Sequence, residues 1–421
     1  MDTERRKFIK KATLASTLGA LGVNTLSKAK GKLNEIQEEE IDKALKAPVL
    51  ITTNLTSPVW IKSIELLRKE NNFICRVKSN DGAEGISVSN NMQMKDLYPI
   101  FIHRIQPFFI GKDARDWERL LDEVYVYQSN YKLQSLALWV PLATLEFAVL
   151  DLLGKLANKS IGEMLGKIHH PKIAVYQANN FRGKSAEESV DLIEAQVRST
   201  GAKALKFKVG GRMSNNQDFP KGRTEALIPM VRDRFGPKMV IYADSNGSYT
   251  VEEAIRIGKI MEDYGYDFYE EPVPFDWYEE TLKVTNAIKI PIAGGEQEPS
   301  MRNFRWLIKN DALDIVQPDI FYFGGMIRAM KVANMAATKG KTCTPHISGS
   351  GLGYLYMMHF VSALPNAGPY HEFKGFNHEI PLVNSSSSLS SVNGMVEVPT
   401  GPGLGITLAP AFIAAHKSVN A

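Results

Sequence analysis

The sequence predicts an α/β protein in which a (β/α)7β barrel follows a smaller α+β region. From Lys172 onward, short apolar runs typical of buried strands alternate with longer helical patterns. Eight such strands, separated by helices, favour a closed parallel barrel. An open doubly wound sheet is the alternative, but it usually has a glycine-rich turn after its first strand, and residues 176–180 contain no glycine.

The barrel strands are expected at Lys172–Ala178, Lys203–Val209, Met239–Asp244, Asp267–Glu270, Ile290–Gly294, Leu313–Gln317, Thr342–His346 and Pro369–Phe373. The clearest helical patterns between them are Ser185–Ser199, Thr224–Phe235, Thr250–Tyr264, Met301–Asn310 and Met326–Thr338. Two of these helices are expected to begin with a capping box, because Ser185 and Thr250 are each followed three residues later by glutamate.

The region before the barrel has a different pattern. Val49–Leu67 and Phe73–Val88 predict antiparallel strands, and Leu142–Leu156 predicts a helix. The chain therefore divides into an export signal (1–29), a linker (30–47), an N-terminal α+β capping domain (48–168), the barrel (169–376) and a C-terminal segment that packs on the capping domain (377–421).

The first 29 residues have the parts of an export signal. A basic start is followed by an apolar stretch over 12–23 and by a possible cleavage pattern of small residues over 27–29. The pair Arg5-Arg6 resembles a twin-arginine signal, although Glu4 stands where that motif usually has Ser or Thr. We therefore expect export to the periplasm by the twin-arginine route. A surface amphipathic helix or an uncleaved anchor are the alternatives.

Charge and cysteine content exclude several other classes. Residues 1–29 hold six basic and two acidic side chains, which accounts for the whole formal charge of +4. The rest of the chain is formally neutral, which gives no support to nucleic-acid binding. Two distant cysteines, Cys75 and Cys343, exclude a Cys-x-x-Cys metal site, and we expect two buried free thiols. No uninterrupted apolar run reaches the ~20 residues of a membrane span.

Polar side chains recur at the C-terminal ends of the expected strands. Asp244, Glu270 and Glu296 follow one another at intervals of 26 residues, about one strand-plus-helix unit. In a barrel, such residues converge on the mouth at which active sites form. The same regions contribute Lys206, Lys208, Asn246, Asp319, His346 and Glu372.

This set of residues indicates metal-assisted proton abstraction. Three neighbouring carboxylates would repel one another without a cation, and oxygen ligands suit Mg²⁺. Lys208 lies on one side of the mouth, where a lysine beside another cation can act as a base. On the other side, Asp319 can fix the tautomer of His346. Two bases beside a metal suit removal of the proton next to a carboxylate, with the metal stabilising the enediolate.

Six short motifs, in order, resemble the mandelate racemase subgroup of the enolase superfamily: Lys206-Phe-Lys208, Ala243-Asp244-Ser-Asn246, Tyr269-Glu270-Glu271-Pro272, Gly294-Gly-Glu296, Gln317-Pro-Asp319 and Pro345-His346. The resemblance extends from about Val49 to Leu408, and the helix containing Leu145–Gly154 is similar to a helix of the family's first domain. It implies a TIM-like barrel with an N-terminal capping domain that the C-terminal tail completes.

The resemblance also implies a role for each position: metal ligands Asp244, Glu270 and Glu296; catalytic residues Lys208, His346 and Asp319; substrate-binding residues Lys206, Asn246 and Glu372. Lys208 would act on one face of the substrate's α-carbon. His346, paired with Asp319, would act as base or acid on the other face.

Loops rich in Asn, Thr and Arg, such as Asn54–Pro58 and Asn179–Arg182, favour a polyhydroxylated acid as substrate. We therefore expect dehydration of a sugar acid to a 2-keto-3-deoxy acid. Racemisation, epimerisation and cycloisomerisation of an anhydro sugar acid share its first step and stay open. A non-catalytic periplasmic sugar-acid binder would be expected to lack a base or a ligand, and none is missing.

The expected cofactor is Mg²⁺, and the expected partner is a small-molecule carboxylate. We expect no nucleic-acid partner, no membrane span in the mature form, and a homo-oligomeric assembly.

Overall fold

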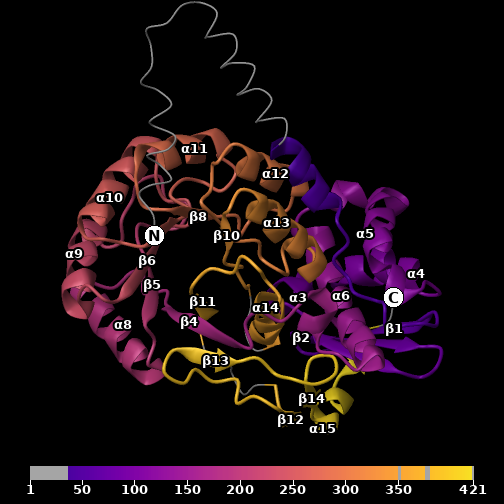
Figure 1. Ribbon diagram of the computed structural model, residues 1–421. Helices are drawn as coiled ribbons and strands as arrows, with labels where there is room; N and C mark the ends of the chain where they lie inside the picture. The colour runs from indigo at the N-terminus through magenta and orange to yellow at the C-terminus, as the bar shows by residue number, and fades with distance from the viewer. Residues whose placement is uncertain (1–36, 349–351, 375–379, 420–421) are drawn as a thin grey trace, which may run out of the picture.

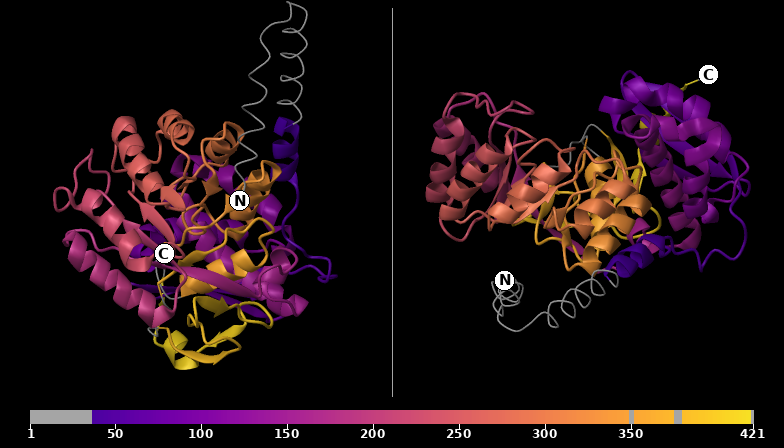
Figure 2. Two further views of the ribbon diagram at one scale, coloured as in Figure 1. Left: turned by 60° about the vertical axis from the view of Figure 1, so that its left-hand side comes forward. Right: turned by 90° about the horizontal axis from the view of Figure 1, so that it is seen from above.

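The computed structural model describes residues 37–348, 352–374 and 380–419, and the predicted export signal lies outside these ranges. A barrel and a capping domain lie side by side, and the C-terminal tail runs along both of them (Figures 1 and 2). A short helix over 37–46 precedes the capping domain.

Eight parallel strands form the barrel sheet in the order β10-β9-β8-β7-β6-β5-β4-β11. Their bounds are β4 (Lys172–Ala178), β5 (Ala204–Lys208), β6 (Val240–Asp244), β7 (Phe268–Glu270), β8 (Ile292–Gly294), β9 (Ile315–Val316), β10 (Thr342–Cys343) and β11 (His371–Phe373). The sheet closes where β10 bonds the segment that leads into β11: the Cys343 N–H donates to the Asn366 carbonyl, and the Gly368 N–H donates to the Cys343 carbonyl. The predicted barrel fold is confirmed, and each predicted strand contains one observed strand.

Helices follow the first seven of these strands along the chain: α8 (Ala186–Thr200), α9 (Arg223–Phe235), α10 (Val251–Asp263), α11 (Tyr278–Ala287), α12 (Met301–Lys309), α13 (Met326–Thr338) and α14 (Leu352–Ser362). The sequence pattern did not predict α11 and α14. Helix α14 is buried on every side, so it lacks the one-sided apolar stripe that marks a surface helix.

The two predicted capping boxes have different outcomes. Ser185 and Glu188 form the box at the start of α8. The prediction for Thr250 is wrong, because its side chain does not cap α10. The Glu253 carboxylate accepts a hydrogen bond from Arg256 instead, at 2.8 Å.

The capping domain begins with three antiparallel strands, β1 (Ile61–Lys69), β2 (Asn72–Ser79) and β3 (Glu84–Val88). Its helices are α3 (Asn91–Ile100), a π-helical turn (Phe101–Ile105), α4 (Gln106–Phe109), α5 (Trp117–Val126), α6 (Leu136–Ala157) and α7 (Ile161–Leu165), with 3₁₀ turns at Ala114–Asp116 and Tyr127–Leu133. Among the described residues, α6 alone is long and apolar enough to cross a membrane. Because 89% of its apolar window is buried inside the protein, α6 fits the role of a core helix.

Helix α6 also joins the capping domain to the barrel. Its buried Glu146 accepts a hydrogen bond from Trp117 Nε1 at 2.8 Å and one from the Ile327 N–H, in the first turn of α13, at 3.1 Å. The neighbouring Gly325 has φ 115°, and a Cβ atom there would collide with the Glu146 carboxylate. Burial raises the pKa of Glu146 to about 7. A carboxylate of the capping domain thus caps the N-terminus of α13, a helix of the barrel.

The C-terminal tail consists of β12 (Leu382–Ser385), β13 (Met395–Glu397), β14 (Ile406–Leu408), α15 (Pro410–Ala414) and β15 (Lys417–Ser418). Strand β13 pairs antiparallel with β4 of the barrel, and β15 pairs antiparallel with β1 of the capping domain. The tail therefore contacts both domains. Cys75 and Cys343 are buried free thiols, as expected.

Candidate active site at the barrel mouth

All nine predicted site residues lie in a barrel strand near its C-terminal end or just beyond it, namely Lys206 and Lys208 (β5), Asp244 and Asn246 (β6), Glu270 (β7), Glu296 (β8), Asp319 (β9), His346 (β10) and Glu372 (β11). Parallel strands place these ends at one mouth of the barrel. The expected convergence is therefore present in the structure.

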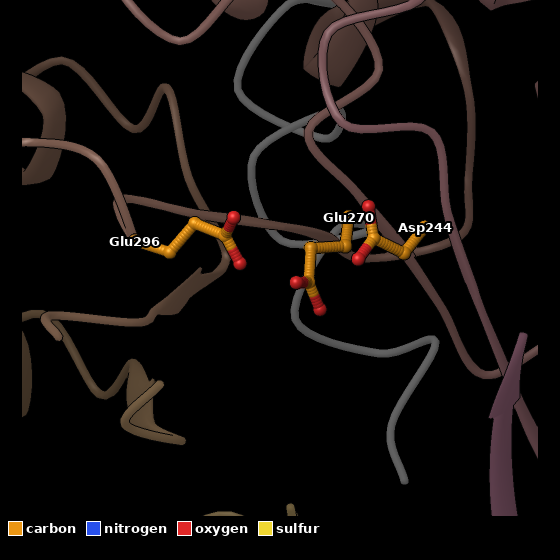
Figure 3. Close-up of side chains that lie close together, drawn as sticks. All are labelled: Asp244, Glu270 and Glu296. Atoms are coloured by element: carbon orange, nitrogen blue, oxygen red, sulfur yellow. The ribbon is translucent and has the colours of Figure 1, made fainter. Parts of the chain in front are cut away.

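Three carboxylates lie together at the centre of this mouth. Asp244, Glu270 and Glu296 are all buried, and each offers an oxygen within 4.8 Å of the others. Glu296 points toward the other two from the opposite side (Figure 3). Three carboxylates without sulfur or nitrogen ligands form the donor set of a hard cation such as Mg²⁺. The residues present therefore fit this ion.

The electrostatics of the three carboxylates differ. Burial raises the pKa of Glu270 to about 7 against the opposing effect of Lys206, and the charges of Asp244 and Glu296 add to the rise. Burial would also raise the pKa of Asp244, but Lys208 and Lys206 outweigh it and lower that pKa. Additional positive charge at the centre of the group would favour the ionised form of Glu270.

Two lysines approach the carboxylates from β5. Lys206 Nζ donates to both oxygens of Glu270 at 2.8 Å, and it lies 3.7 Å from Asp244 Oδ2 and 3.8 Å from Glu372 Oε2. Lys208 Nζ contacts Asp244 Oδ2 directly. Both lysines reach the mouth because residues two apart on a strand face the same side.

The opposite side of the mouth presents a histidine–aspartate pair. His346 Nδ1 lies 2.7 Å from Asp319 Oδ2, and His346 Nε2 lies 3.2 Å from Glu296 Oε2. The second Asp319 oxygen accepts the backbone N–H groups of Phe321 and Tyr322 at 2.8 Å each. Burial alone would lower the pKa of His346, but Glu296 and Asp319 outweigh it and raise the pKa to about 9.

Exposure separates the two candidate bases from the other predicted site residues. The side chains of Lys208 and His346 are 13% and 15% exposed, whereas that of Lys206 is only 3% exposed. Lys208 contacts Asp244 and His346 contacts Glu296, so these two side chains lie at opposite ends of the carboxylate group. A substrate entering the mouth can therefore reach both.

Two further residues shape the site, although their sequence context predicted no role for them there. Gln317 Nε2 donates to Glu270 Oε2 at 2.9 Å. Lys374 Nζ contacts Glu372 Oε1. The spacing of two residues could have predicted this contact, because residues two apart on a strand face the same side.

Arg182, from one of the loops expected to set specificity, bonds other loops of the mouth. Its guanidinium donates to Asn246 Oδ1 and to the Gly210 carbonyl, both at 2.9 Å. Asn246 in turn approaches Glu296 Oε1 at 3.4 Å. Arg182 therefore braces the loops after β5 and β6 through the protein's own oxygens.

This fold and site define a class of barrel proteins with a carboxylate centre at the mouth and ionisable side chains on either side of it. Residues 188–412 match the family described as enolase C-terminal domain-like. The chain belongs to this family, as its motifs predicted.

Two enzymes are among the relatives of this chain. Arabinonate dehydratase of Saccharolobus solfataricus is 27% identical over 342 residues, which cover 81% of this chain and 89% of the relative. D-galactarolactone cycloisomerase of Agrobacterium fabrum is 29% identical over 310 residues, which cover 72% and 80%.

A solved structure shows the same fold with a metal. It is a mandelate racemase/muconate lactonizing protein from Paracoccus denitrificans, complexed with magnesium. It matches with a TM-score of 0.77 at 25% identity and covers 86% of this chain and 99% of its own. The chain's relatives thus include acid-sugar dehydratases and cycloisomerases of the enolase superfamily.

Proposed function

We propose that this protein is a magnesium-dependent enzyme that removes the proton next to the carboxylate of a sugar acid. Loss of water then gives a 2-keto-3-deoxy acid. The observation that carries the proposal is the placement of Lys208 and His346, which are accessible and lie at opposite ends of the buried carboxylate group. The sugar-acid dehydratase among the relatives supports the class of substrate.

The chain's own residues can perform each proton transfer. Magnesium bound by Asp244, Glu270 and Glu296 would supply the positive charge that stabilises the enediolate. Lys208, in its neutral form, takes the α-proton. His346 gives its Nε2 proton to the β-hydroxyl, which departs as water, while Asp319 holds the ring through Nδ1. The resulting enol tautomerises to the 2-keto acid.

A second candidate is cycloisomerisation, which the Agrobacterium relative favours. It begins with the same proton abstraction, but an oxygen of the substrate itself is expelled or attacks, so no water is lost. The mass of the product separates the two reactions. A product lighter than the substrate by one water indicates dehydration, and an unchanged mass indicates cycloisomerisation.

The test is a panel of sugar acids incubated with the protein and Mg²⁺, with detection of 2-keto acid. We expect at least one acid to be converted, and we expect His346→Asn to abolish most of the conversion. A parallel incubation in D₂O detects proton abstraction without net conversion. If no acid in a broad panel is converted and none exchanges its α-proton, the proposal is wrong.

We also propose that the protein is exported to the periplasm by the twin-arginine route, on the basis of Arg5-Arg6 before a short apolar stretch. Changing both arginines to lysine should leave the precursor in the cytoplasm. Unchanged export would reject this route. The expected homo-oligomer stays a prediction that light scattering can measure.

A further inference from the structure

A chain of hydrogen bonds links the capping domain to the histidine–aspartate pair. Asn90, in the loop between β3 and α3, donates from Nδ2 to Ser348 Oγ at 2.8 Å. Ser348 Oγ donates to Asp319 Oδ1 at 3.1 Å. Asp319 Oδ2 then lies 2.7 Å from His346 Nδ1. Two hydrogen bonds therefore separate a residue of one domain from the aspartate that orients a candidate catalytic residue of the other.

The direction of these hydrogen bonds is fixed. Asn90 Oδ1 accepts the N–H of Gln93 and caps α3, so its amide nitrogen must face Ser348. A serine hydroxyl has one hydrogen, and the nitrogen of an amide can only donate. Ser348 therefore accepts from Asn90 and gives its single hydrogen to Asp319.

The side chains of this chain of hydrogen bonds are buried, so the loss of any one of these bonds is costly. Asn90 is 1% exposed, Ser348 is 5% exposed and Asp319 is fully buried. Inside a protein, a hydrogen bond to a charged group is stronger than in water, and a buried polar group that loses its partner costs free energy. Asp319 Oδ1 already accepts two backbone N–H groups. The Ser348 hydroxyl is its third donor, and the one that depends on the capping domain.

The same part of the capping domain has a second contact with the barrel that does not reach Asp319. Tyr356 Oη, on α14, accepts the Val88 N–H at 2.8 Å and donates to the Val88 carbonyl at 3.2 Å. This contact fixes the end of β3 only two residues before Asn90. It provides a matched control, because its loss weakens the joint between the domains without removing a donor from Asp319.

We infer that Asn90 and Ser348 are positioning residues, through which the capping domain sets the orientation of Asp319 and hence of His346. The inference rests on the proposed function in so far as it gives His346 a catalytic role. It predicts that proton transfer at His346 depends on how the capping domain packs on the barrel, in addition to any contact that this domain makes with substrate.

Four variants test the inference. Ser348→Ala removes the link, and Ser348→Thr keeps the hydroxyl. Asn90→Asp keeps an oxygen to cap α3 but replaces the donor with an acceptor that competes for the Ser348 hydrogen. Tyr356→Phe is the control. We expect Ser348→Ala and Asn90→Asp to lower kcat by about tenfold, a usual scale for loss of an orienting partner, with KM little changed. Ser348→Thr and Tyr356→Phe should keep nearly normal kcat.

A second measurement needs no substrate. The proton on His346 Nδ1 should give a downfield NMR resonance, which His346→Asn identifies by its loss. We expect this resonance to move in Ser348→Ala and Asn90→Asp but not in Tyr356→Phe. If it stays in place in all three, or if Tyr356→Phe moves it equally, the inference is wrong. If it moves as expected while the wild-type protein converts no acid, the proposed function fails and the positioning link stands.

Discussion

The two sides of the barrel mouth are held by different means. On the lysine side, Lys206 and Lys208 project from one strand, β5, and contact the carboxylates of the next two strands. On the histidine side, Asp319 and His346 lie beyond strands of only two residues, β9 and β10. Asp319 accepts hydrogen bonds from the loop N–H groups of Phe321 and Tyr322 and from the Ser348 hydroxyl. Ser348 in turn accepts one from Asn90 of the capping domain. A side chain presented by a strand is placed by local periodicity, whereas one presented by a loop needs partners from elsewhere in the fold.

The largest expected effect lies between the two sides, at the carboxylates that both of them contact. Chelation should abolish activity, and Mg²⁺ should restore it. Glu270→Gln should lose metal affinity, because a neutral amide replaces one of three anionic ligands. Titration calorimetry with Mg²⁺ measures the loss. Glu298→Gln is the control, since this buried carboxylate bonds Tyr278 and Asn303 instead. Full activity in excess chelator would contradict the metal assignment.

The next effect separates the two sides directly. His346→Asn keeps the approximate size of the side chain but removes the proton carrier, and we expect turnover to fall by ~10² or more. Exchange of the α-proton should survive for a substrate presented to Lys208. Lys208→Ala should show the mirror pattern, with exchange only for the epimer presented to His346. Proton NMR in D₂O measures both. A nearly normal rate in either variant would show that the two-base arrangement is wrong.

Acid should lower the stability of the folded protein through a buried histidine of α14, the helix that follows β10. His359, on α14, is buried, and burial lowers its pKa from 6.5 to about 4. Above pH 6.5 the imidazole is neutral in both the folded and the unfolded chain and adds no pH dependence. As the pH falls from 6.5 toward 4, the unfolded chain binds a proton that the folded protein excludes. The free energy of unfolding should then fall by about 1.4 kcal/mol per pH unit from this group.

Urea unfolding at several pH values measures this dependence. In His359→Gln the protein should be less stable at pH 7, but its stability should fall less steeply between pH 6.5 and 4. Hydrogen exchange should show α14 opening more readily at pH 5 relative to α8, on the lysine side. An unchanged slope in the variant would mean that His359 is already protonated in the folded protein.

The smallest expected effect concerns the helices around the lysine side. Ser185→Ala should cost about 1 kcal/mol of unfolding free energy, because it removes a formed capping box from α8. Thr250→Ala should cost clearly less, because the Thr250 side chain makes no capping hydrogen bond to α10. Urea unfolding of the two variants compares them. Equal losses would indicate that the cap at Ser185 has no special effect.

The barrel and the residues at its mouth follow from local patterns in the sequence. A strand has a period of two residues, and the interval of 26 residues between Asp244, Glu270 and Glu296 repeats one strand-plus-helix unit. Both are local properties, so residues at strand ends must meet at one mouth, whatever the details of packing.

The hydrogen bonds that brace the mouth depend on tertiary packing. Asn90 and Ser348 are 258 residues apart, and no sequence period relates them. Arg182 belongs to a polar loop, but only the packed structure directs its guanidinium to Asn246. A hydrogen bond between distant loops depends on how the two domains pack against each other. Because these contacts depend on the packing of the entire chain, a local sequence pattern does not predict them.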